Sequence, residues 1–428
     1  MKHAIPVEGI GPFAEEMANA VTKCVHCGFC LPACPTYNLL REEMDSPRGR
    51  IVLMKSVLEG AIELTDALPY IDRCLGCLGC VTACPSGVPY DEIVIPFKSY
   101  AEERRQRSPI DRFVRTLSHE TIPHPHRFRA AARLGNLAKP MKNRLPKQIA
   151  AMLELLPAEV HSAISLPEVY PAHRKRIARV ALLAGCVQQV LEPEINWASL
   201  RVLAHNGVEV HVPKNQGCCG GLALHAGDSK TCRQFAIKIL EAFRGDYEAI
   251  ITNAAGCGST LRDYPILFKG TDLEEEATQF ASRVVDISVF LSRIGIEKPP
   301  PLPEPTKIAY HDACHLAHAQ GVIHEPRHLL EQIPNAKLVP LSEGDLCCGS
   351  AGSYNLEQPE IAHKLGVRKA SNIINSGAQI VVTGNIGCLV QIRAHLNAQA
   401  SGSEQLRQKI PVLHTIQLLD KAYRTDWA

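Results

Sequence analysis

Two cysteine runs near the N-terminus place the strongest constraint on how this chain folds. Residues 23–35 read KCVHCGFCLPACP and residues 73–85 read RCLGCLGCVTACP, so both follow C-x2-C-x2-C-x3-C-P. Two-residue gaps let three thiolates wrap around one face of a 4Fe-4S cube, and the fourth cysteine, before proline, reaches the other cluster in two-cluster proteins. We assign Cys24, Cys27, Cys30 and Cys84 to one 4Fe-4S cluster, and Cys74, Cys77, Cys80 and Cys34 to a second.

The pattern disfavours two other uses of clustered cysteine. Zinc sites normally pair C-x2-C units for four ligands in total, and no zinc motif needs two copies of a run ending in Cys-Pro. Disulfides do not persist inside a cell. Segment 1–17 has acidic residues and no apolar core of signal-peptide length, which predicts a cytoplasmic protein. The 17 cysteines are therefore expected to serve mainly as ligands.

Length and composition exclude several classes of protein. A chain of 428 residues fits two or three domains, each with its own core. A net charge of +2 gives no global bias toward nucleic acid, so no nucleic-acid partner is expected. No run of about 18 apolar residues occurs, which predicts that the chain does not span a membrane.

The second half of the chain is duplicated. Residues 217–221 (GCCGG) match residues 346–350 (LCCGS), and residues 253–258 (NAAGCG) match residues 384–389 (GNIGCL). Matching cysteines lie 128, 129 and 131 positions apart, and so constant an offset indicates a repeated structural unit. Each copy holds a lone cysteine, a Cys-Cys-Gly (CCG) and a later cysteine: Cys186, Cys218, Cys219 and Cys257, then Cys314, Cys347, Cys348 and Cys388.

Each copy alternates short strand-like runs with helical patterns, which predicts parallel α/β units. The predicted strands are 180–184, 208–212 and 249–252 in the first copy, and 308–310, 337–340 and 380–383 in the second. The cysteines follow these strands, and loops beyond the carboxyl ends of parallel strands are where such sheets bind ligands. We therefore expect the four thiols of each copy to converge on one point.

Helical signals frame the N-terminal cysteine runs. Ser46 and Pro47 have the signature of an N-cap and a first helical residue, and residues 51–58 supply an apolar face. The predicted fold class is α+β and multidomain. It comprises a helical ferredoxin-like domain at 1–107, a basic helical connector at 108–176, and CCG α/β domains at 177–300 and 301–428.

The CCG cysteines admit more than one chemistry. Four thiolates bind zinc in a closed tetrahedral site or hold a further iron-sulfur cluster, and the sequence does not decide between them. Cys232 has no counterpart in the second copy, which favours a packing role. His311 and His315 flank Cys314 in the second copy alone, and we favour an orienting or functional role for them over ligation.

The connector is strongly basic. Residues 98–147 hold thirteen Lys and Arg against four Asp and Glu. The favoured interpretation is a solvated linker; the alternative is a surface that docks an acidic partner or anionic lipid.

Taken together, the tandem cysteine runs and two CCG units resemble a cysteine-rich family. It includes the CCG-containing component of heterodisulfide reductase, the iron-sulfur component of anaerobic glycerol-3-phosphate dehydrogenase, and the glycolate oxidase iron-sulfur subunit. The likeness is strongest to the last, through CVHCGFCLPACPTY at 24–37, YHDACHLAHAQGV at 310–322 and CCGSAGSYNL at 347–356.

The resemblance implies an electron-transfer role in a glycolate (2-hydroxy acid) dehydrogenase. Separate flavin-containing subunits would oxidise glycolate, and this chain would pass electrons to quinone or another acceptor at the cytoplasmic face of the membrane. The sequence has no G-x-G-x-x-G fingerprint after a strand, which agrees with substrate chemistry on a partner and leaves no catalytic residue to assign here.

One departure from heterodisulfide reductase is informative. There each CCG unit ends in C-x2-C, whereas here the ends read Cys257-Gly-Ser and Cys388-Leu-Val. The missing fifth thiol argues against a non-cubane cluster and disulfide-reductase chemistry, and it leaves an ordinary cluster, zinc or an empty site open. The remaining alternatives are a relative serving lactate or glycerol-3-phosphate, a self-contained disulfide or quinone reductase, and a scaffold whose CCG half binds zinc.

Overall fold

The computed structural model describes residues 5, 10, 13–157, 159–160, 162–163, 165–401 and 409–426. The sequence predicts no secretory signal in residues 1–17. Most of these residues lie outside the described part of the chain. Within the described part of the chain, every helix is too short or too polar to cross a membrane.

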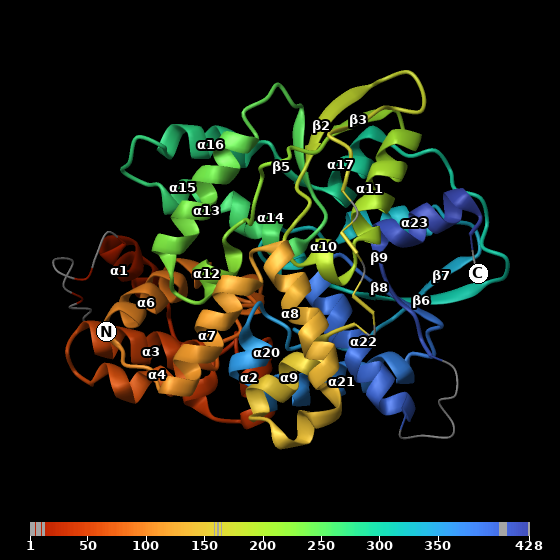
Figure 1. The fold of residues 1–428 in the computed structure, drawn as a ribbon. Helices are drawn as coiled ribbons and strands as arrows, with labels where there is room; N and C mark the ends of the chain where they lie inside the picture. The colour runs from red at the N-terminus through yellow and green to blue at the C-terminus, as the bar shows by residue number, and fades with distance from the viewer. Residues whose placement is uncertain are drawn as a thin grey trace.

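The cysteine runs lie in an all-helical N-terminal module (Figure 1). Its helices are α1 (Ala14–Thr22), α2 (Pro35–Leu40), η1 (Glu43–Asp45), α3 (Pro47–Leu58), α4 (Leu64–Asp72), α5 (Gly79–Thr82) and α6 (Asp91–Arg104). Ser46 caps α3 as predicted, because its hydroxyl accepts a hydrogen bond from the Gly49 amide at 2.9 Å. Met54 and Phe97 are fully buried, so α3 and α6 contribute to one small core.

A second helical segment follows the module. It consists of α7 (Pro109–Thr121), α8 (Pro125–Ala138), η2 (Lys139–Arg144) and α9 (Lys147–Leu155). The sequence favoured a solvated linker here, but α9 packs against helices of the second CCG unit and Arg129 is buried with a hydrogen bond to the Gln189 carbonyl at 3.0 Å. The connector is therefore a packed layer of helices in which Arg129 is buried and other basic residues, such as Arg127, stay exposed.

The first CCG unit is built on a five-stranded sheet in the order β1-β3-β2-β4-β5. Its elements are β1 (Val169–Tyr170), β2 (Ala178–Leu182), α10 (Gln188–Leu191), α11 (Glu194–His205), β3 (Val208–His211), α12 (Gly221–His225), α13 (Ser229–Ala242), β4 (Ala249–Thr252), α14 (Ala255–Arg262), α15 (Tyr264–Leu267), α16 (Glu274–Ser282), β5 (Val284–Asp286) and α17 (Ile287–Ile294). Only β1 pairs antiparallel. All four residues of β4 are buried, as expected of a strand covered on both faces.

The second unit repeats this plan with a parallel sheet in the order β7-β6-β8-β9. Its elements are β6 (Thr306–His311), α18 (Cys314–Ala317), α19 (His324–Glu331), β7 (Ala336–Val339), α20 (Tyr354–Glu357), α21 (Pro359–Asn375), β8 (Ile380–Thr383), α22 (Ile386–Ser401), β9 (Val412–His414) and α23 (Thr415–Arg424). The prediction of parallel α/β units is confirmed.

The two CCG units lie side by side (Figure 1), and one hydrophobic core includes buried residues of both. Helix α17 of the first unit packs against α19 of the second, and α23 of the second packs against α11 of the first. Arg201 on α11 also donates hydrogen bonds at 2.8 and 2.7 Å to Asp420 on α23. The last helix of each unit therefore packs against the other unit, and the halves are not independent bodies.

Candidate iron-sulfur and metal-binding sites

The two N-terminal cysteine runs share one local backbone conformation. His26 and Gly76, just before the second cysteine of each run, have φ of 57° and 62°. Gly28 and Leu78, just after it, have φ of 85° and 60°. These left-handed residues turn the chain around the cysteines in the same way in both runs, although two of them are not glycine.

The predicted ligands of the first cluster surround a hollow near the surface. The hollow is lined by Cys24, Cys27, Cys30 and Cys84, together with Cys80 of the second run. Cys27 is exposed, and Cys24 and Cys30 are half-buried. Burial raises the pKa of Cys30 to about 11, and burial with the neighbouring thiols Cys84 and Cys27 raises that of Cys24. Thiols so placed become thiolates when a cationic iron core binds, so this donor set fits a cluster.

The predicted ligands of the second cluster lie deeper. Cys34, Cys74 and Cys80 are buried, and Cys77 is half-buried. Burial, with neighbouring thiols that include Cys34 and Cys74, raises the pKa of Cys77 and Cys80 well above the usual value. Cys34 thus lies among the cysteines of the other run, and Cys84 beside Cys24, which is the arrangement the crossed assignment requires. The ligand assignment itself stays a prediction.

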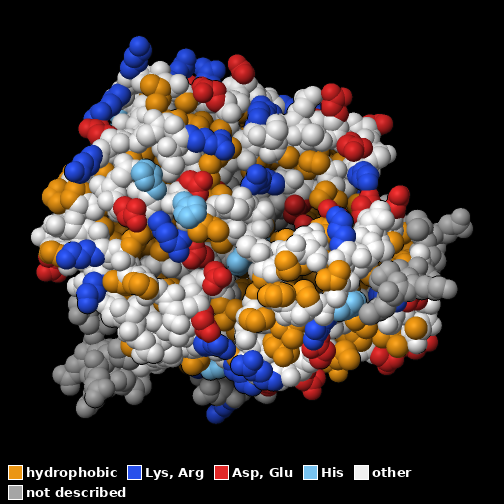
Figure 2. All heavy atoms as spheres, turned by 180° about the vertical axis from the view of Figure 1, so that it is seen from behind, with side chains coloured by type: hydrophobic (Ala, Val, Ile, Leu, Met, Phe, Trp, Pro, Cys, Tyr) orange, Lys and Arg blue, Asp and Glu red, His pale blue; other side chains and the backbone are white. Residues whose placement is uncertain are grey.

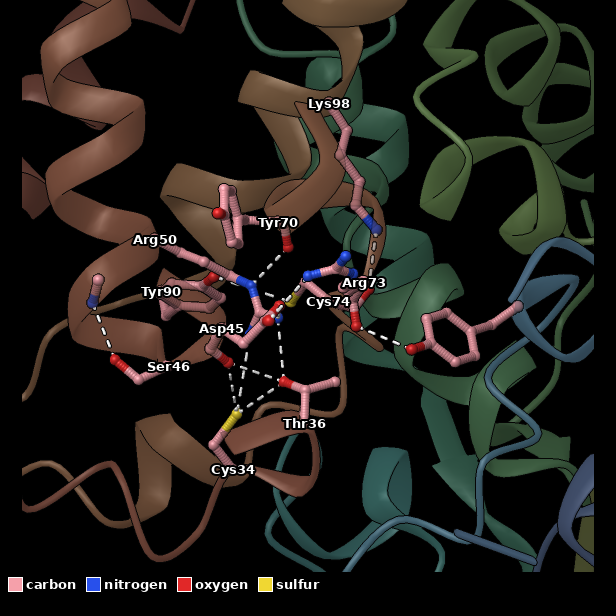
Figure 3. A network of polar contacts seen from close by, with 12 residues as sticks. Cys34, Thr36, Asp45, Ser46, Arg50, Tyr70, Arg73, Cys74, Tyr90 and Lys98 are labelled. Atoms are coloured by element: carbon pink, nitrogen blue, oxygen red, sulfur yellow. Dashed lines mark hydrogen bonds and ion pairs between the residues drawn. The ribbon is translucent and has the colours of Figure 1, made fainter. Parts of the chain in front are cut away.

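A buried polar network supports the second cysteine set (Figure 3). Arg50 is 1% exposed and donates hydrogen bonds to Asp45 at 3.2 Å, Thr36 at 3.0 Å and the Tyr70 carbonyl at 2.8 Å. Its Nη1 also lies 3.7 Å from Cys34 Sγ. Sequence reasoning did not single out Arg50, because an arginine within the first turns of α3 gives no sign of being buried.

Two cations, Arg50 and Lys98, act on the thiol of Cys74. Burial alone would raise the pKa of this thiol, but the positive charges of Arg50 and Lys98, together with hydrogen bonds to the Gly76 backbone and Tyr90, lower it. Lys98 Nζ lies 3.3 Å from the Cys74 carbonyl and 3.4 Å from the His225 carbonyl. Positive charge is therefore placed where electron density on a bound cluster would be stabilised.

The thiols of the first CCG unit converge at the carboxyl ends of β2, β3 and β4. Cys186 Sγ and Cys218 Sγ are 3.5 Å apart. Hydrogen bonds from Cys218 and then Cys257 lower the pKa of Cys219 well below the usual value. These contacts link all four predicted residues. Cys232 is fully buried, and a side chain on Gly220 would come within 2.9 Å of its sulfur.

The second CCG unit gathers its thiols in the same way and adds a histidine. Hydrogen bonds with Cys347 and then Cys388 lower the pKa of Cys348 well below the usual value against the opposing effect of burial, and an interaction with His311 lowers it further. Cys314 interacts in turn with Cys347, through a hydrogen bond, and with Cys388, through charge. His315, the other histidine that the sequence singled out, points elsewhere: its Nε2 lies 3.1 Å from the Gly76 carbonyl.

Family models match three parts of the chain. Residues 20–88 match a 4Fe-4S dicluster domain, and residues 180–262 and 308–393 match a cysteine-rich domain. A probable glycolate oxidase iron-sulfur subunit from Bacillus subtilis is 34% identical over 430 residues, which cover 96% of this chain and 96% of that protein. The glycolate oxidase iron-sulfur subunit of Escherichia coli is 34% identical, and the match covers 96% of this chain and 97% of that protein.

This chain belongs to the glycolate oxidase iron-sulfur subunit family. The family resemblance and the fold class predicted from the sequence are thereby confirmed. A hypothetical protein from Helicobacter pylori, known from a crystal structure, aligns with 96% of this chain and 72% of its own at a TM-score of 0.54. Its 11% identity limits that likeness to the fold.

In this member of the glycolate oxidase iron-sulfur subunit family, the second cysteine run contacts the second CCG unit. The thiols of Cys77 and Cys314 are close enough for their charges to interact, and Leu75 packs with Cys314 in one hydrophobic cluster. Tyr354 Oη donates a hydrogen bond to the Arg73 carbonyl at 2.9 Å. Sequence reasoning gave no signal for this contact, because the two cysteines are more than two hundred residues apart.

Proposed function

We propose that this chain relays electrons from a flavin-containing glycolate-oxidising partner to quinone or another acceptor. The observation that carries the proposal is the placement of its cysteines. Cys27 reaches the surface, the second set lies deeper, and Cys77 packs against the hydrophobic cluster that holds Cys314 of the CCG half. A 4Fe-4S cluster, when bound, takes up and releases single electrons. The thiols therefore form a path from the surface into the molecule.

The surface around Cys27 supports docking of an electron-donating partner. Val25 and Phe29, on either side of Cys27, are each 67% exposed. Apolar side chains also gather on the face of the molecule shown in Figure 2. Exposed apolar groups beside a redox site favour a protein interface, because burying them on association is favourable.

A cavity of about 130 Å³ supports an acceptor site at the junction of the module with both CCG units. Its wall includes Gly76 from the second cysteine run, Lys98, and two histidines, His225 and His315. Within the described residues His225 Nε2 has no hydrogen-bond partner. Both ring nitrogens of His315 are hydrogen-bonded, to Ser259 and to the Gly76 carbonyl, so His225 Nε2 and the Lys98 ammonium group are the groups that suit the carbonyl oxygens of a quinone head group.

The connector supports peripheral contact with a membrane. Leu134, Leu137 and Met141 are 67%, 78% and 56% exposed on α8 and η2, beside exposed cations such as Arg127. Apolar side chains flanked by cations favour the interface of an anionic bilayer. We expect the chain to sediment with anionic vesicles and Leu137→Glu to abolish this. Equal sedimentation of the two proteins would contradict it.

The central experiment is anaerobic purification with the flavin-containing partner, followed by electron paramagnetic resonance after adding glycolate or lactate. We expect glycolate to reduce two interacting centres, with Cys27→Ser perturbing one and Cys77→Ser the other. His225→Phe should leave both signals intact but stop quinone reduction. Iron-free material, or signals that survive both cysteine substitutions, would overturn the relay; reduction by lactate alone would reassign the substrate.

A further inference from the structure

The second CCG unit contains a donor set that the first lacks. His311 at the end of β6, Cys348 after β7 and Cys388 in α22 have ligand atoms that all lie within 4.8 Å of one another. The three side chains are at most 3% exposed. Within the described part of the chain, no other three Cys, His or carboxylate side chains converge so closely.

The ring of His311 is oriented as a ligand. Its Nδ1 lies 3.0 Å from the Gly344 carbonyl, which only accepts hydrogen bonds, so Nδ1 carries the proton. Nε2 therefore keeps its lone pair, and among the described oxygen and nitrogen atoms it has no hydrogen-bond partner. A metal-bound histidine almost always donates its other N–H in this way, which fixes the ring and raises its basicity.

The spacing of the donors suits a single ion. Tetrahedral zinc, with bonds of about 2.3 Å to sulfur and 2.0 Å to nitrogen, holds its donor atoms roughly 3.5–3.8 Å apart. A 4Fe-4S cube is larger and holds its four thiolates further apart. The eight N-terminal cysteines, all among the described residues, provide no trio as close as the one at His311. The separation of the ligand atoms thus distinguishes the two kinds of site within one chain.

Charge at the site agrees with a metal held by thiolates. Lys369 on α21 is 2% exposed, and its Nζ donates hydrogen bonds to the carbonyls of Glu343 and Gly344. Cys348 and Cys347 interact electrostatically with this ammonium group. In the first unit, the offset of 128 between the matching lone cysteines places Leu183 where the second has His311. The two sites therefore differ in their donors.

We propose that the second CCG unit binds one zinc ion through His311 Nε2 and the thiolates of Cys348 and Cys388. The fourth donor is the thiolate of Cys347 or Cys314. Zinc is the ion whose tetrahedral Cys₃His site matches this donor set. Zinc does not change oxidation state, so electrons of the proposed relay would pass between the N-terminal clusters and the acceptor without entering this site.

The test uses the full chain, purified without oxygen and washed with a chelator to remove loosely bound metal. Elemental analysis should find one zinc per chain beside about eight irons. Zinc-edge X-ray absorption of the wild-type protein should show one nitrogen at about 2.0 Å and three sulfurs at about 2.3 Å. His311→Ala should lose at least nine-tenths of the zinc while its iron content stays unchanged. Cys219→Ser, in the first unit, is the matched control and should keep zinc.

Two results would overturn the proposal. One is zinc-free protein with about four additional irons per chain, which would place a cluster in the second unit. The other is a zinc shell of four sulfurs without an imidazole. Both readouts use the wild-type chain, so they decide the question even where His311→Ala does not fold.

Discussion

Lys98 and Arg50 place two positive charges next to one deeply set cysteine group. Arg50 is held by its buried partner Asp45, and its removal would leave that carboxylate in the core with Arg73 as its one remaining ion-pair partner among the described residues. Lys98 reaches the same region from α6 and is bound only by two carbonyls within the described contacts. Lys98 is therefore the better residue for testing the electrostatics of the site, because its substitution leaves no buried charge unpaired.

We expect Lys98→Gln to make the potential of the second cluster more negative. The amide keeps a hydrogen-bond donor but removes a charge that stabilises electron density. A shift of roughly 20–60 mV is expected, since 59 mV corresponds to a tenfold change in a one-electron equilibrium. Redox titration followed by paramagnetic resonance measures it. Arg104→Gln on the same helix is the control, because Arg104 is exposed; equal shifts in both variants would contradict the prediction.

Asp286 predicts a pH dependence of stability. Burial raises its pKa from 3.8 to about 6, although it accepts hydrogen bonds from Ser288 as the N-cap of α17. The folded chain therefore holds this proton at a pH where the unfolded chain has lost it. The stabilisation is complete below about pH 4 and is lost as the pH rises through 6.

We expect Asp286→Asn, which keeps the cap acceptor, to remove this part of the pH dependence. Relative to the wild type, the variant should gain on the order of 2 kcal/mol between pH 4 and pH 7. Urea unfolding at several pH values measures the difference. Parallel pH profiles of the two proteins would show that Asp286 is not the group responsible.

At the scale of elements, one glycine decides how closely the N-terminal module approaches the first CCG unit. Gly227, between α12 and α13, has φ of 85°, and a Cβ there would lie 2.6 Å from the Lys98 carbonyl on α6. Gly270 has φ of 72° but open space around its Cβ position. Comparing substitutions at Gly227 and Gly270 therefore separates the cost of backbone strain from the cost of a clash between elements.

Gly227→Ala should lower the free energy of unfolding by about 1–2 kcal/mol more than Gly270→Ala. Both variants carry the penalty of a left-handed alanine, about 1–2 kcal/mol. Only the first also forces α6 away from α12. Urea unfolding gives the difference, and limited proteolysis should cut the junction faster in Gly227→Ala alone. Equal destabilisation would mean that the contact adapts without cost.

At the scale of the whole molecule, the two CCG units are held together by their last helices, each of which packs against the other unit. Leu419 on α23 is fully buried in a core that includes strands of both units. A cavity at that position removes contacts from each half. We therefore expect the two units to lose stability together.

Leu419→Ala should cost about 2–5 kcal/mol. Hydrogen exchange should then speed up in β2 of the first unit as well as β8 of the second. Val94→Ala in the N-terminal module, also buried, should affect that module first. Faster exchange confined to the second unit would show that the halves fold independently.

The sequence by itself determined the local features of this protein. Spacing alone identified the two N-terminal cysteine runs, and the repeat offset identified the paired CCG units. Ser46 was recognisable as a cap, and 249–252 and 380–383 coincide with β4 and β8. Each of these is a motif, a periodicity or a repeat, which the order of the residues specifies before any packing is known.

The tertiary structure decided everything that depends on distant residues meeting. Strands β1, β5 and β9 have two or three residues each, too few for a pattern, and exist because a sheet edge pairs with them. The burial of Arg50, the electrostatic interaction of Cys77 with Cys314, and the approach of His311 to Cys348 all follow from packing. Spacing predicts which side chains are ligands, but which ligands share an ion is set by how the sheets and helices pack.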